Sequence, residues 1–600
     1  MMADVSAPKS SDQLSVRSLV HLARFAVPFT WHFLGVVALV IVFNTTSVLQ
    51  PYLVKLAIDN DIASKSFHGL EVIAVVYVSI VIIGALANYT QVVLLQYAGQ
   101  SIIQRIRMAL FRHIESQSMA FFDKNAIGRL VTNVSNDTET VSQFFTQFFL
   151  SVVRDGLSVV MVIFAMFRLN AGVAWQCMVI VPVIFIISFA FRKRLRVSYQ
   201  TARTRLSSVV AFLAENLAGI RIIQIFNQER RQANAFLTLN DRHRQANVKS
   251  YMTSVMFNRS LDFLGNVSVA AIVYVGGLRV LHGAMEFGTL YAFISYIRQF
   301  FQPINALTQQ WNNLQSSSVS ADRIGRVLAV EPLVTDNKDL VNSLSDEEVR
   351  GAVEFQDVCF SYKPGEPVLT DISFRVRPGE FVGFVGPTGA GKSSIMALLT
   401  RFYDPVSGVI LLDGEDIKSF LQTDLHRHIG IVQQEMFLFT GSVKDNIRLF
   451  RDDISDETVV ESAKVVGAHE MIMRLPRGYE THLVGKGSNL STGERQLLGF
   501  ARIVALNPKV LILDEATANL DSQTESLVQK GLTAVAKNRT TLVIAHRLST
   551  IRHADMIYVL SKGRIVERGN HEELVSAQGL YADLYQKSGI EFEMEQTAHP

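Results

Sequence analysis

The chain has 600 residues, of which 49% are hydrophobic and only 18% charged, and its mean hydropathy is +0.23. This length is too great for one hydrophobic core and this composition is too apolar for a purely soluble enzyme, so several domains with a membrane portion are expected. The net charge of +3 comes with no single basic stripe, which argues against a nucleic-acid partner. The two cysteines, Cys177 and Cys359, lie far apart and match no metal or redox spacing.

The N-terminal half is predicted to be an α-helical transmembrane domain, residues 1–325, with six membrane-spanning helices. The first residues lack the basic and apolar layout of a cleaved signal peptide. Apolar residues from Ser15 to Trp31 recur at helical spacing, which predicts either an amphipathic helix on the membrane surface or the start of the first span. Apolar runs long enough to cross a bilayer are found at 33–54, 71–97, 143–168, 171–192, 258–281 and 286–311.

Arginine-rich connections set the predicted orientation. The segments 98–142 and 193–257 are long and rich in arginine, whereas the other connections between spans are short and carry few cations. The positive-inside rule places the two long segments, and with six spans both termini, in the cytoplasm. Helical spacing continues through both segments, so the spans are expected to extend beyond the bilayer, with breaks for short transverse helices near Phe121–Asn125 and Glu215–Ile220. The chain is therefore predicted to be a multi-pass protein of the inner (cytoplasmic) membrane.

Several polar side chains fall in the predicted spans. Charged and amide groups are costly in hydrocarbon, so they are expected to face protein or a wet cavity. They either contact a substrate or form ordinary ion pairs in the cytoplasmic extensions, and the sequence leaves both alternatives open. These residues are Arg154, Asp155, Asn258, Arg259, Asp262, Arg298, Gln299, Gln302, Gln309 and Gln310.

The composition changes after the last span. Residues 326–350 are acidic and polar without a sustained period, which predicts a linker, and residues 591–600 form a short tail. Residues 351–590 are predicted to form a soluble α/β domain with a helical middle section near 418–505. Strands are expected at 353–362, 369–376, 380–385, 510–513 and 541–544.

The loop after the third of these strands has the full P-loop pattern between a predicted strand and a predicted helix. Its glycines let backbone N–H groups converge on phosphate oxygens, and the following helix N-terminus adds a favourable dipole. Lys392 is predicted to reach the β- and γ-phosphates and Ser393 to bind Mg²⁺. The predicted nucleotide-binding residues are Gly386, Pro387, Thr388, Gly389, Ala390, Gly391, Lys392, Ser393 and Ser394.

Two carboxylates end the strand Val510–Leu513 about 120 residues after the P-loop lysine, which is the Walker B arrangement. Asp514 is predicted to hold Mg²⁺ beside Ser393. Glu515 is predicted to polarise the water that attacks the γ-phosphate, either as a general base or as a positioning group.

The stretch Leu490–Gln496, with the sequence Leu-Ser-Thr-Gly-Glu-Arg-Gln, lies between these two motifs. It resembles the signature motif of ATP-binding cassette (ABC) proteins, and the resemblance extends over the whole chain. The resemblance implies that Tyr362 stacks on adenine, that Gln434 senses Mg²⁺ and the attacking water, and that His546 contacts the γ-phosphate. It also implies that Ser491 and Gly493 face phosphate, and that Asn519–Asp521 forms the loop that crosses the dimer.

The membrane half resembles the exporters of the same family. Phe121–Lys124 and Gly128–Val131 are similar to their first intracellular loop, and Val484–Gly487 to the loop that contacts the coupling helices. Leu290–Ile297 is similar to the sixth span of bacterial multidrug exporter subunits. The resemblance implies an ATPase half-transporter that binds ATP and Mg²⁺, pairs with a second half-transporter subunit and contacts membrane lipids. It also implies export of hydrophobic or amphipathic small molecules taken from the inner leaflet or the cytoplasm.

Two rival functions remain. A lipid flippase has the same architecture, and Arg154 and Arg298 are candidates to meet a phosphorylated headgroup. A non-transporting ATP-binding regulator or receptor on this scaffold would be expected to lose Glu515 or His546, and both are present.

The signature departs from the family pattern at two positions. Thr492 stands where glycine is common, and Glu494 stands where glutamine is common. A β-branched residue and an added negative charge near a polyphosphate both predict a weaker signature. Because the chain's own P-loop is intact, this favours a heterodimer with two unequal ATP sites, with a homodimer as the alternative.

Overall fold

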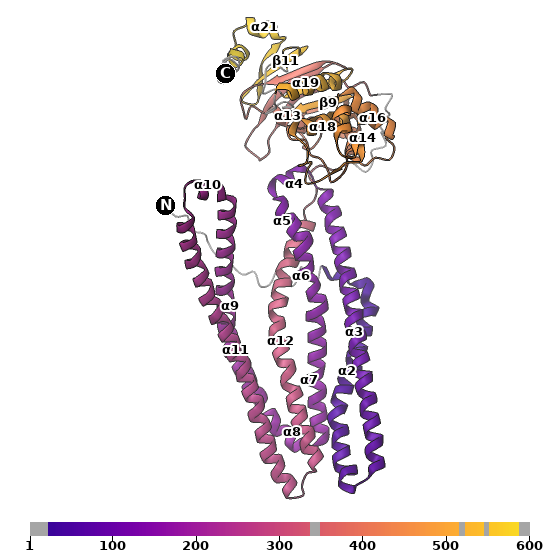
Figure 1. The fold of residues 1–600 in the computed structure, drawn as a ribbon, viewed down its shortest axis with the longest axis vertical. Coiled ribbons are helices and arrows are strands. Elements are labelled where there is room, and N and C mark those ends of the chain that lie inside the picture. The colour runs from indigo at the N-terminus through magenta and orange to yellow at the C-terminus, as the bar shows by residue number, and fades with distance from the viewer. Residues whose placement is uncertain (1–21, 337–348, 515–521, 545–550, 587–600) are drawn as a thin grey trace. The chain divides into compact units, whose positions relative to one another are not determined.

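A computed structural model describes residues 22–336, 349–514, 522–544 and 551–586 (Figure 1). It divides into two compact units. The first comprises Met1–Glu115 with Ile127–Val330, and the second comprises Ser116–Ala126 with Glu331–Pro600. The short segment 116–126 therefore packs with the C-terminal unit, although it lies between helices of the first unit in the chain.

The first unit is built of long helices and short turns, in which η1 and η2 are 3₁₀ turns and η3, η4 and η5 are π-helical. Its elements are η1 (Ala23–Phe25), η2 (Val27–Phe29), α2 (Thr30–Leu56), η3 (Ala57–Ile62), α3 (Phe67–Glu115), α5 (Ile127–Thr132), η4 (Asn133–Asp137), α6 (Thr138–Gln143), η5 (Phe144–Phe148), α7 (Phe149–Leu169), α8 (Ala171–Met178), α9 (Ile180–Ala218), α10 (Ile220–Ile225), α11 (Glu229–Leu281) and α12 (Phe287–Leu328). Because a span needs only about 20 residues, α3, α9 and α11 continue as helices well beyond the bilayer, as predicted.

Among the described residues, five helical segments are long and apolar enough to cross a membrane. They are Val27–Ile62, Phe67–Glu115, Ile127–Leu169, Ala171–Ala218 and Glu229–Leu281, and they contain the first five predicted spans. The sixth predicted span lies in α12, which has 42 residues but is not among the five. Arg298, Gln299 and Gln302 interrupt its apolar residues. The predicted count of six is therefore not confirmed by apolarity.

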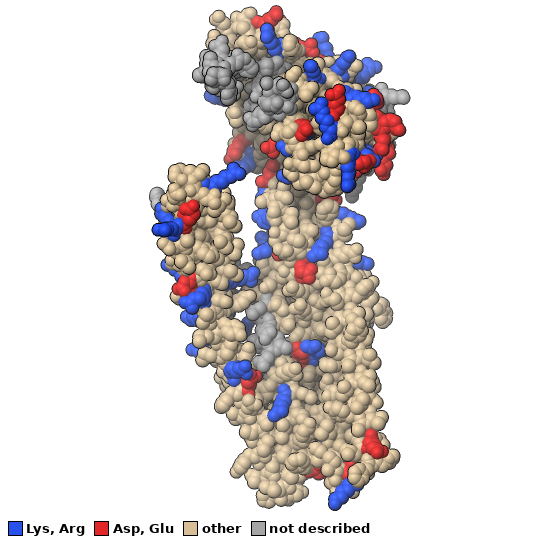
Figure 2. All heavy atoms as spheres, in the orientation of Figure 1, with Lys and Arg blue, Asp and Glu red and all other residues tan. Residues whose placement is uncertain are grey.

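The spanning helices expose apolar side chains. Val75, Ile82 and Leu86 of α3 lie on the surface of the single chain. On the face drawn in Figure 2, charged side chains are few on the lower parts of these helices and more frequent on the upper parts of α9 and α11. Apolar surface of this extent is stable when it faces hydrocarbon or a partner, which is why these helices belong to a membrane protein.

The structure decides between two alternatives at the N-terminus and corrects one local prediction. Residues 22–31 form η1, η2 and the beginning of α2. The first spanning segment begins at Val27, so the last of these residues are the start of the first span. The break predicted near Glu215–Ile220 is present at Gly219, whose φ and ψ of −93° and 13° end α9. The short helix, however, is α10, one turn later than predicted. The other transverse helix is confirmed as α4 (Met119–Lys124) in the second unit.

The second unit contains three sheets with helices packed around them, and most of its predicted strands are confirmed. Besides α4, its elements are β1 (Val353–Phe360), β2 (Leu369–Val376), β3 (Phe381–Val385), α13 (Lys392–Leu399), β4 (Ser407–Leu412), β5 (Glu415–Asp416), η6 (Ile417–Ser419), α14 (Gln422–His428), β6 (Ile429–Val432), β7 (Gly441–Ser442), α15 (Val443–Arg448), α16 (Asp456–Val465), α17 (His469–Arg474), η7 (Gly478–Glu480), β8 (His482–Leu483), α18 (Thr492–Leu506), β9 (Val510–Asp514), α19 (Ser522–Ala536), β10 (Thr540–Ile544), β11 (Met556–Ser561), β12 (Arg564–Gly569) and α21 (His571–Ser576).

A six-stranded sheet forms the centre of this unit, in the order β12-β11-β3-β10-β9-β6. A four-stranded antiparallel sheet, β2-β1-β4-β5, and the pair β7-β8 complete the unit. Strands β9 and β10 lie inside the large sheet and are buried along almost their whole length, because helices cover both faces of a parallel sheet. In β2, buried and exposed residues alternate, as expected for a strand with one solvated face.

One close approach in the first unit depends on glycine. A Cβ atom at Gly99 of α3 would lie 2.1 Å from Cγ2 of Thr146, a buried side chain of the π-helical η5. By contrast, a Cβ atom at Gly156 of α7 would meet nothing within 4 Å. The packing of α3 against η5 therefore requires the missing side chain at Gly99.

We expect Gly99→Ala to lower the thermal unfolding temperature of the purified chain by several degrees. Overpacking a buried helix contact costs about 1–3 kcal/mol. The matched control, Gly156→Ala, has room for the methyl group and is expected to leave the unfolding temperature unchanged or raise it slightly. Equal unfolding temperatures for the two variants would contradict this account of the α3–η5 contact.

Candidate functional site

The predicted site residues follow neighbouring parallel strands. Strands β3, β10, β9 and β6 run parallel, and the register pairs Ile544 of β10 with Asp514 of β9, so these two strands end level. The P-loop follows β3, Gln434 follows β6, and Asp514 ends β9. Ligands of open parallel sheets bind at the carboxyl ends of the strands. The topology therefore brings three of the predicted motifs to one edge of the sheet.

Five predicted positions lie outside the described residues. They are Glu515, the dimer-crossing loop Asn519–Asp521 and His546. Glu515 directly follows β9, and His546 follows the last residue of β10 by two positions. Their roles therefore stay predictions.

The P-loop backbone adopts conformations that favour glycine. Gly386, Gly389 and Gly391 have φ angles of 148°, 83° and 102°. A Cβ atom at Gly386 would lie 2.1 Å from the carbonyl oxygen of Leu560, and one at Gly391 would lie 2.5 Å from Cδ2 of Leu369. Two of the three glycines are thus required both by backbone angle and by space, which explains their spacing in the sequence.

Lys392 begins α13 and its side chain folds over the loop. Its Nζ donates to the carbonyl oxygens of Gly386 at 2.6 Å and Pro387 at 3.2 Å, and the residue is only 6% exposed. The first N–H groups of an α-helix have no partner within the helix. A buried ammonium beside these N–H groups is suited to a polyphosphate.

The remaining P-loop residues divide by exposure. Thr388 and Ser393 are exposed, whereas Ala390 and Ser394 are buried. The buried hydroxyl of Ser394 lies 3.0 Å from that of Tyr362. Ser394 therefore orients Tyr362, and the exposed hydroxyl of Ser393 is the one available to a metal ion.

Tyr362 is suitably placed for stacking. The residue is 45% exposed, and its ring meets that of Phe360 edge to face, with centroids 4.7 Å apart. An aromatic ring that is held at its edge and hydroxyl but keeps exposed surface can receive a nucleobase on its face.

The loop after Gln434 is held by a buried arginine that sequence reasoning missed. Gln434 is exposed, while Arg502 of α18 donates to the carbonyl oxygens of Phe437 at 3.2 Å and Asn446 at 3.0 Å. Burial lowers the pKa of Arg502 to about 10, so it keeps its charge at neutral pH. The sequence feature that points to this contact is an arginine within the apolar run of α18.

The signature residues begin α18. Ser491 is its N-cap: Oγ accepts from the N–H of Glu494 at 3.3 Å, and the Glu494 carboxylate accepts from the N–H of Ser491 at 2.7 Å. This reciprocal capping box gives Glu494 a structural role that its departure from the family pattern did not indicate. Gly493 is buried in the first turn, and Thr492 is exposed.

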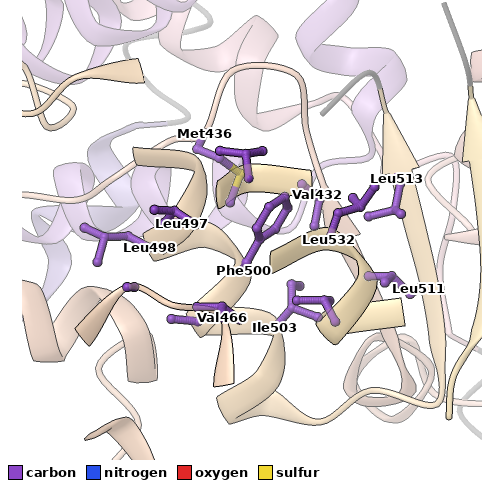
Figure 3. Packing of buried hydrophobic residues seen from close by; sticks show 14 of the residues in the cluster. Val432, Met436, Val466, Leu497, Leu498, Phe500, Ile503, Leu511, Leu513 and Leu532 are labelled. Atoms are coloured by element: carbon purple, nitrogen blue, oxygen red, sulfur yellow. The ribbon is translucent and has the colours of Figure 1, made fainter. Parts of the chain in front are cut away.

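A hydrophobic core joins α18 to the strands that carry the site. Leu497, Phe500 and Ile503 pack in one cluster with residues of β6, β9 and α19 (Figure 3). A Cβ atom at Gly499 would lie 1.6 Å from Cε of Met436, which shows how closely α18 approaches the loop after Gln434. The signature helix and the loop after β6 are therefore parts of one packed body.

No group of three or more His, Cys, Asp and Glu side chains is placed to hold a metal ion in the part of the chain that the structure describes. The predicted Mg²⁺ site is of a different kind, because it needs one hydroxyl, one carboxylate and phosphate oxygens.

Comparisons with known proteins identify the family. The model described as "ABC transporter transmembrane region" matches residues 33–304, and the model described as "ABC transporter" matches residues 369–518. A probable multidrug resistance ABC transporter ATP-binding/permease protein of Bacillus subtilis (strain 168) is 38% identical over 86% of this chain and 77% of that protein. The chain belongs to the ABC transporter family.

This ABC transporter is also 33% identical to the ATP-dependent lipid A-core flippase of Syntrophus aciditrophicus (strain SB), over 94% of this chain and 92% of the relative. Among solved structures, a bacterial Atm1-family ABC exporter with ATP bound matches with a TM-score of 0.76 and 27% identity, over 93% of this chain and 98% of that one. The ABC transporter is thus an exporter-type, multi-pass membrane ATPase that binds ATP and couples its hydrolysis to transport.

For this ABC transporter we expect Glu515→Gln to retain ATP binding and to lose at least about 10²-fold in ATP turnover. Glutamine keeps a hydrogen-bonding amide but cannot act as a base. Binding of a fluorescent ATP analogue and phosphate release by the purified complex measure the two properties. Retained turnover would remove Glu515 from the role.

Lys392→Ala is expected to fail at an earlier step, by weakening ATP binding itself. The substitution deletes the buried ammonium that is placed to contact phosphate. Lys464→Ala is the matched control, because Lys464 forms an exposed ion pair with Glu461. Equal ATP affinity in the two lysine variants at low salt would contradict the P-loop assignment.

Proposed function

We propose that the chain is one half of an exporter that moves hydrophobic or amphipathic compounds of the multidrug type across the cytoplasmic membrane by alternating access. The observation that carries this proposal is the P-loop, Gln434 and Asp514 at one edge of a sheet in a chain that also has membrane-spanning helices. The similarity to a multidrug-type relative supports the substrate class. Arginine in the segments 98–142 and 193–257 supports a cytoplasmic position for both termini.

The residues fit Mg²⁺ as the second ligand of the ATP site. Ser393 has an exposed hydroxyl, and Asp514 is a half-buried carboxylate at the end of β9. Mg²⁺ prefers oxygen ligands and commonly shares them with substrate phosphates. Ser393, Asp514 and Gln434 would hold the ion, which would neutralise charge on the phosphates. Glu515 would take the proton of the attacking water, and His546 would contact the γ-phosphate.

Exposed apolar residues at α10 support a partner subunit. Ile222, Ile225 and Phe226 are each more than 60% exposed, at the turn between the long helices α9 and α11. Apolar residues gathered at a turn this far from the apolar part of the helices indicate a protein contact. We propose that α10, with Leu217 and Ile220 at its edge, contacts a nucleotide-binding domain of the dimer.

One observation favours the lipid flippase as a second candidate. Tyr291, Ser295, Arg298 and Gln302 recur at helical spacing and share an exposed or half-exposed face of α12. The opposite face, including Phe293, is buried. Among the described residues none is placed to pair with Arg298. A guanidinium that finds no protein partner in a membrane span needs a wet cavity or an anionic ligand.

Transport into sealed inside-out vesicles separates the two candidates. For a multidrug exporter, we expect ATP-dependent uptake of hydrophobic cations, with at most a small effect of Arg298→Ala. For a flippase, we expect movement of a phosphorylated lipid that falls at least about tenfold in Arg298→Ala, because a charge-assisted contact is lost. Arg259→Ala is the control, since Arg259 already pairs with Asp262 at 3.0 Å. A complex that transports neither class would refute both candidates.

We further propose that the chain works in a heterodimer. In the dimer, the signature of one chain would contact the ATP bound to the P-loop of the other, so the altered signature of this chain would act on the partner's ATP. The Glu494 carboxylate lies beside the N-terminus of α18, where it adds negative charge near a bound polyphosphate. The site built on the chain's own P-loop would then hydrolyse ATP, and the partner's site would mainly bind it. A homodimer would place the altered signature in both sites.

ATP hydrolysis per dimer tests the heterodimer. We expect little ATP hydrolysis from the chain alone and full hydrolysis only with a partner. Glu515→Gln in this chain is expected to abolish that hydrolysis, whereas the matching change in the partner is expected to leave most of it. Glu494→Gln keeps an acceptor for the Ser491 N–H while removing the charge, so it is expected to raise hydrolysis at the partner's site. Full drug-stimulated activity from the unpaired chain would overturn the proposal.

A further inference from the structure

Tyr403 lies between the predicted adenine-stacking residue and α4. Its ring meets the ring of Tyr362 edge to face, with centroids 5.2 Å apart and planes at 90°. Its hydroxyl donates to the Asp123 carboxylate of α4. One side chain thus contacts both the ATP site and the helix captured by the second unit.

The chain joins α4 directly to a membrane-spanning segment on each side. It follows α3, which has 49 residues, and precedes the helical segment Ile127–Leu169. Phe121 of α4 is 6% exposed, and the segment 116–126 belongs to the second unit. A displacement of α4 therefore acts on two membrane-spanning segments through the backbone.

The turn that carries Tyr403 is held firmly. It directly follows α13, the helix of the P-loop, and Arg401 within it has a φ of 54° and is 4% exposed. The Arg401 guanidinium donates to the carbonyl oxygen of Phe420 at 2.9 Å and pairs with Asp336 at 3.2 Å. Asp336 belongs to the segment after α12. The turn is therefore tied to the P-loop helix on one side and to the chain leaving α12 on the other.

Burial and the neighbouring Asp123 raise the pKa of the Tyr403 hydroxyl. The hydroxyl therefore remains protonated at any physiological pH and acts as a donor to the carboxylate. This direction of donation makes the contact specific for a phenol, because phenylalanine fills the same space without it.

We propose that Tyr403 is a positioning residue that transmits occupancy of the adenine site to α4 through its edge contact with Tyr362 and its hydroxyl contact with Asp123. A base stacked on Tyr362 restricts that ring, the restricted ring fixes Tyr403, and the fixed hydroxyl holds α4. A ligand shifts a conformational equilibrium only through contacts that differ between the two states, and this chain of contacts supplies one. The inference rests on the ATP-driven transport described above and adds a route for its coupling.

Hydrogen exchange of the full-length complex tests the proposal without a transported substrate. We expect ATP to slow amide exchange in Met119–Lys124 at least about fivefold in the wild type. In Tyr403→Phe this protection is expected to disappear, while protection of the P-loop persists and ATP affinity stays within about threefold. Tyr558→Phe is the matched control, because its hydroxyl donates to the carbonyl oxygen of Arg375 in the same unit.

A double-mutant cycle separates coupling from simple bracing. Asp123→Asn and Tyr403→Phe are each expected to lower transport about tenfold with basal ATP hydrolysis within about twofold, and the double variant is expected to be no worse than either. An α4 whose exchange ignores ATP in the wild type, or is still protected in Tyr403→Phe, overturns the proposal. Additive losses in the double variant, or a lowered unfolding temperature that accounts for the lost transport, overturn it as well.

Discussion

The matched ends of β3, β10, β9 and β6 are the constraint on which the ATP site depends. Each strand is short and buried on both faces, so a register slip of one residue would exchange the side chains that pack on the two faces of the sheet. The same slip would move Asp514 away from the P-loop edge. The core that packs α18 against β6 and β9 stabilises this register (Figure 3). Folding and site assembly are therefore the same event in this unit.

The first unit meets a different constraint, since its helices must be apolar enough for lipid and polar enough for a function. Its helices place apolar and polar side chains on different faces. On α12 Phe293, Ile297 and Phe300 pack into the unit, and a polar stripe that includes Arg298 and Gln302 stays exposed. Averaged hydropathy mixes these faces, which is why α12 does not count as a span by apolarity although it is long enough.

The chain crosses between the two units at residues 115–116, 126–127 and 330–331. The second unit captures residues 116–126 of the chain and ties down the segment after α12 through Arg401 and Asp336. Both connections meet within one turn after the P-loop helix. The turn has to keep its geometry when α4 or the P-loop helix moves, because a loose turn would absorb the movement that ATP produces.

The sequence by itself determined the order of the two halves, the P-loop, the strand ending in Asp514 and the membership of Leu490–Gln496 in a signature, because these features are local and carry their own spacing. It also predicted the long helices, whose periodicity extends over many turns. Only the tertiary structure decided that Arg502 holds the loop after Gln434, that Glu494 caps α18 and that Tyr403 contacts both Tyr362 and Asp123. The π-helical segments and the place of α10 also came from the structure. Contacts between residues far apart in the chain, and helix breaks of a single residue, depend on how the elements pack, and one sequence contains no local pattern that records that packing.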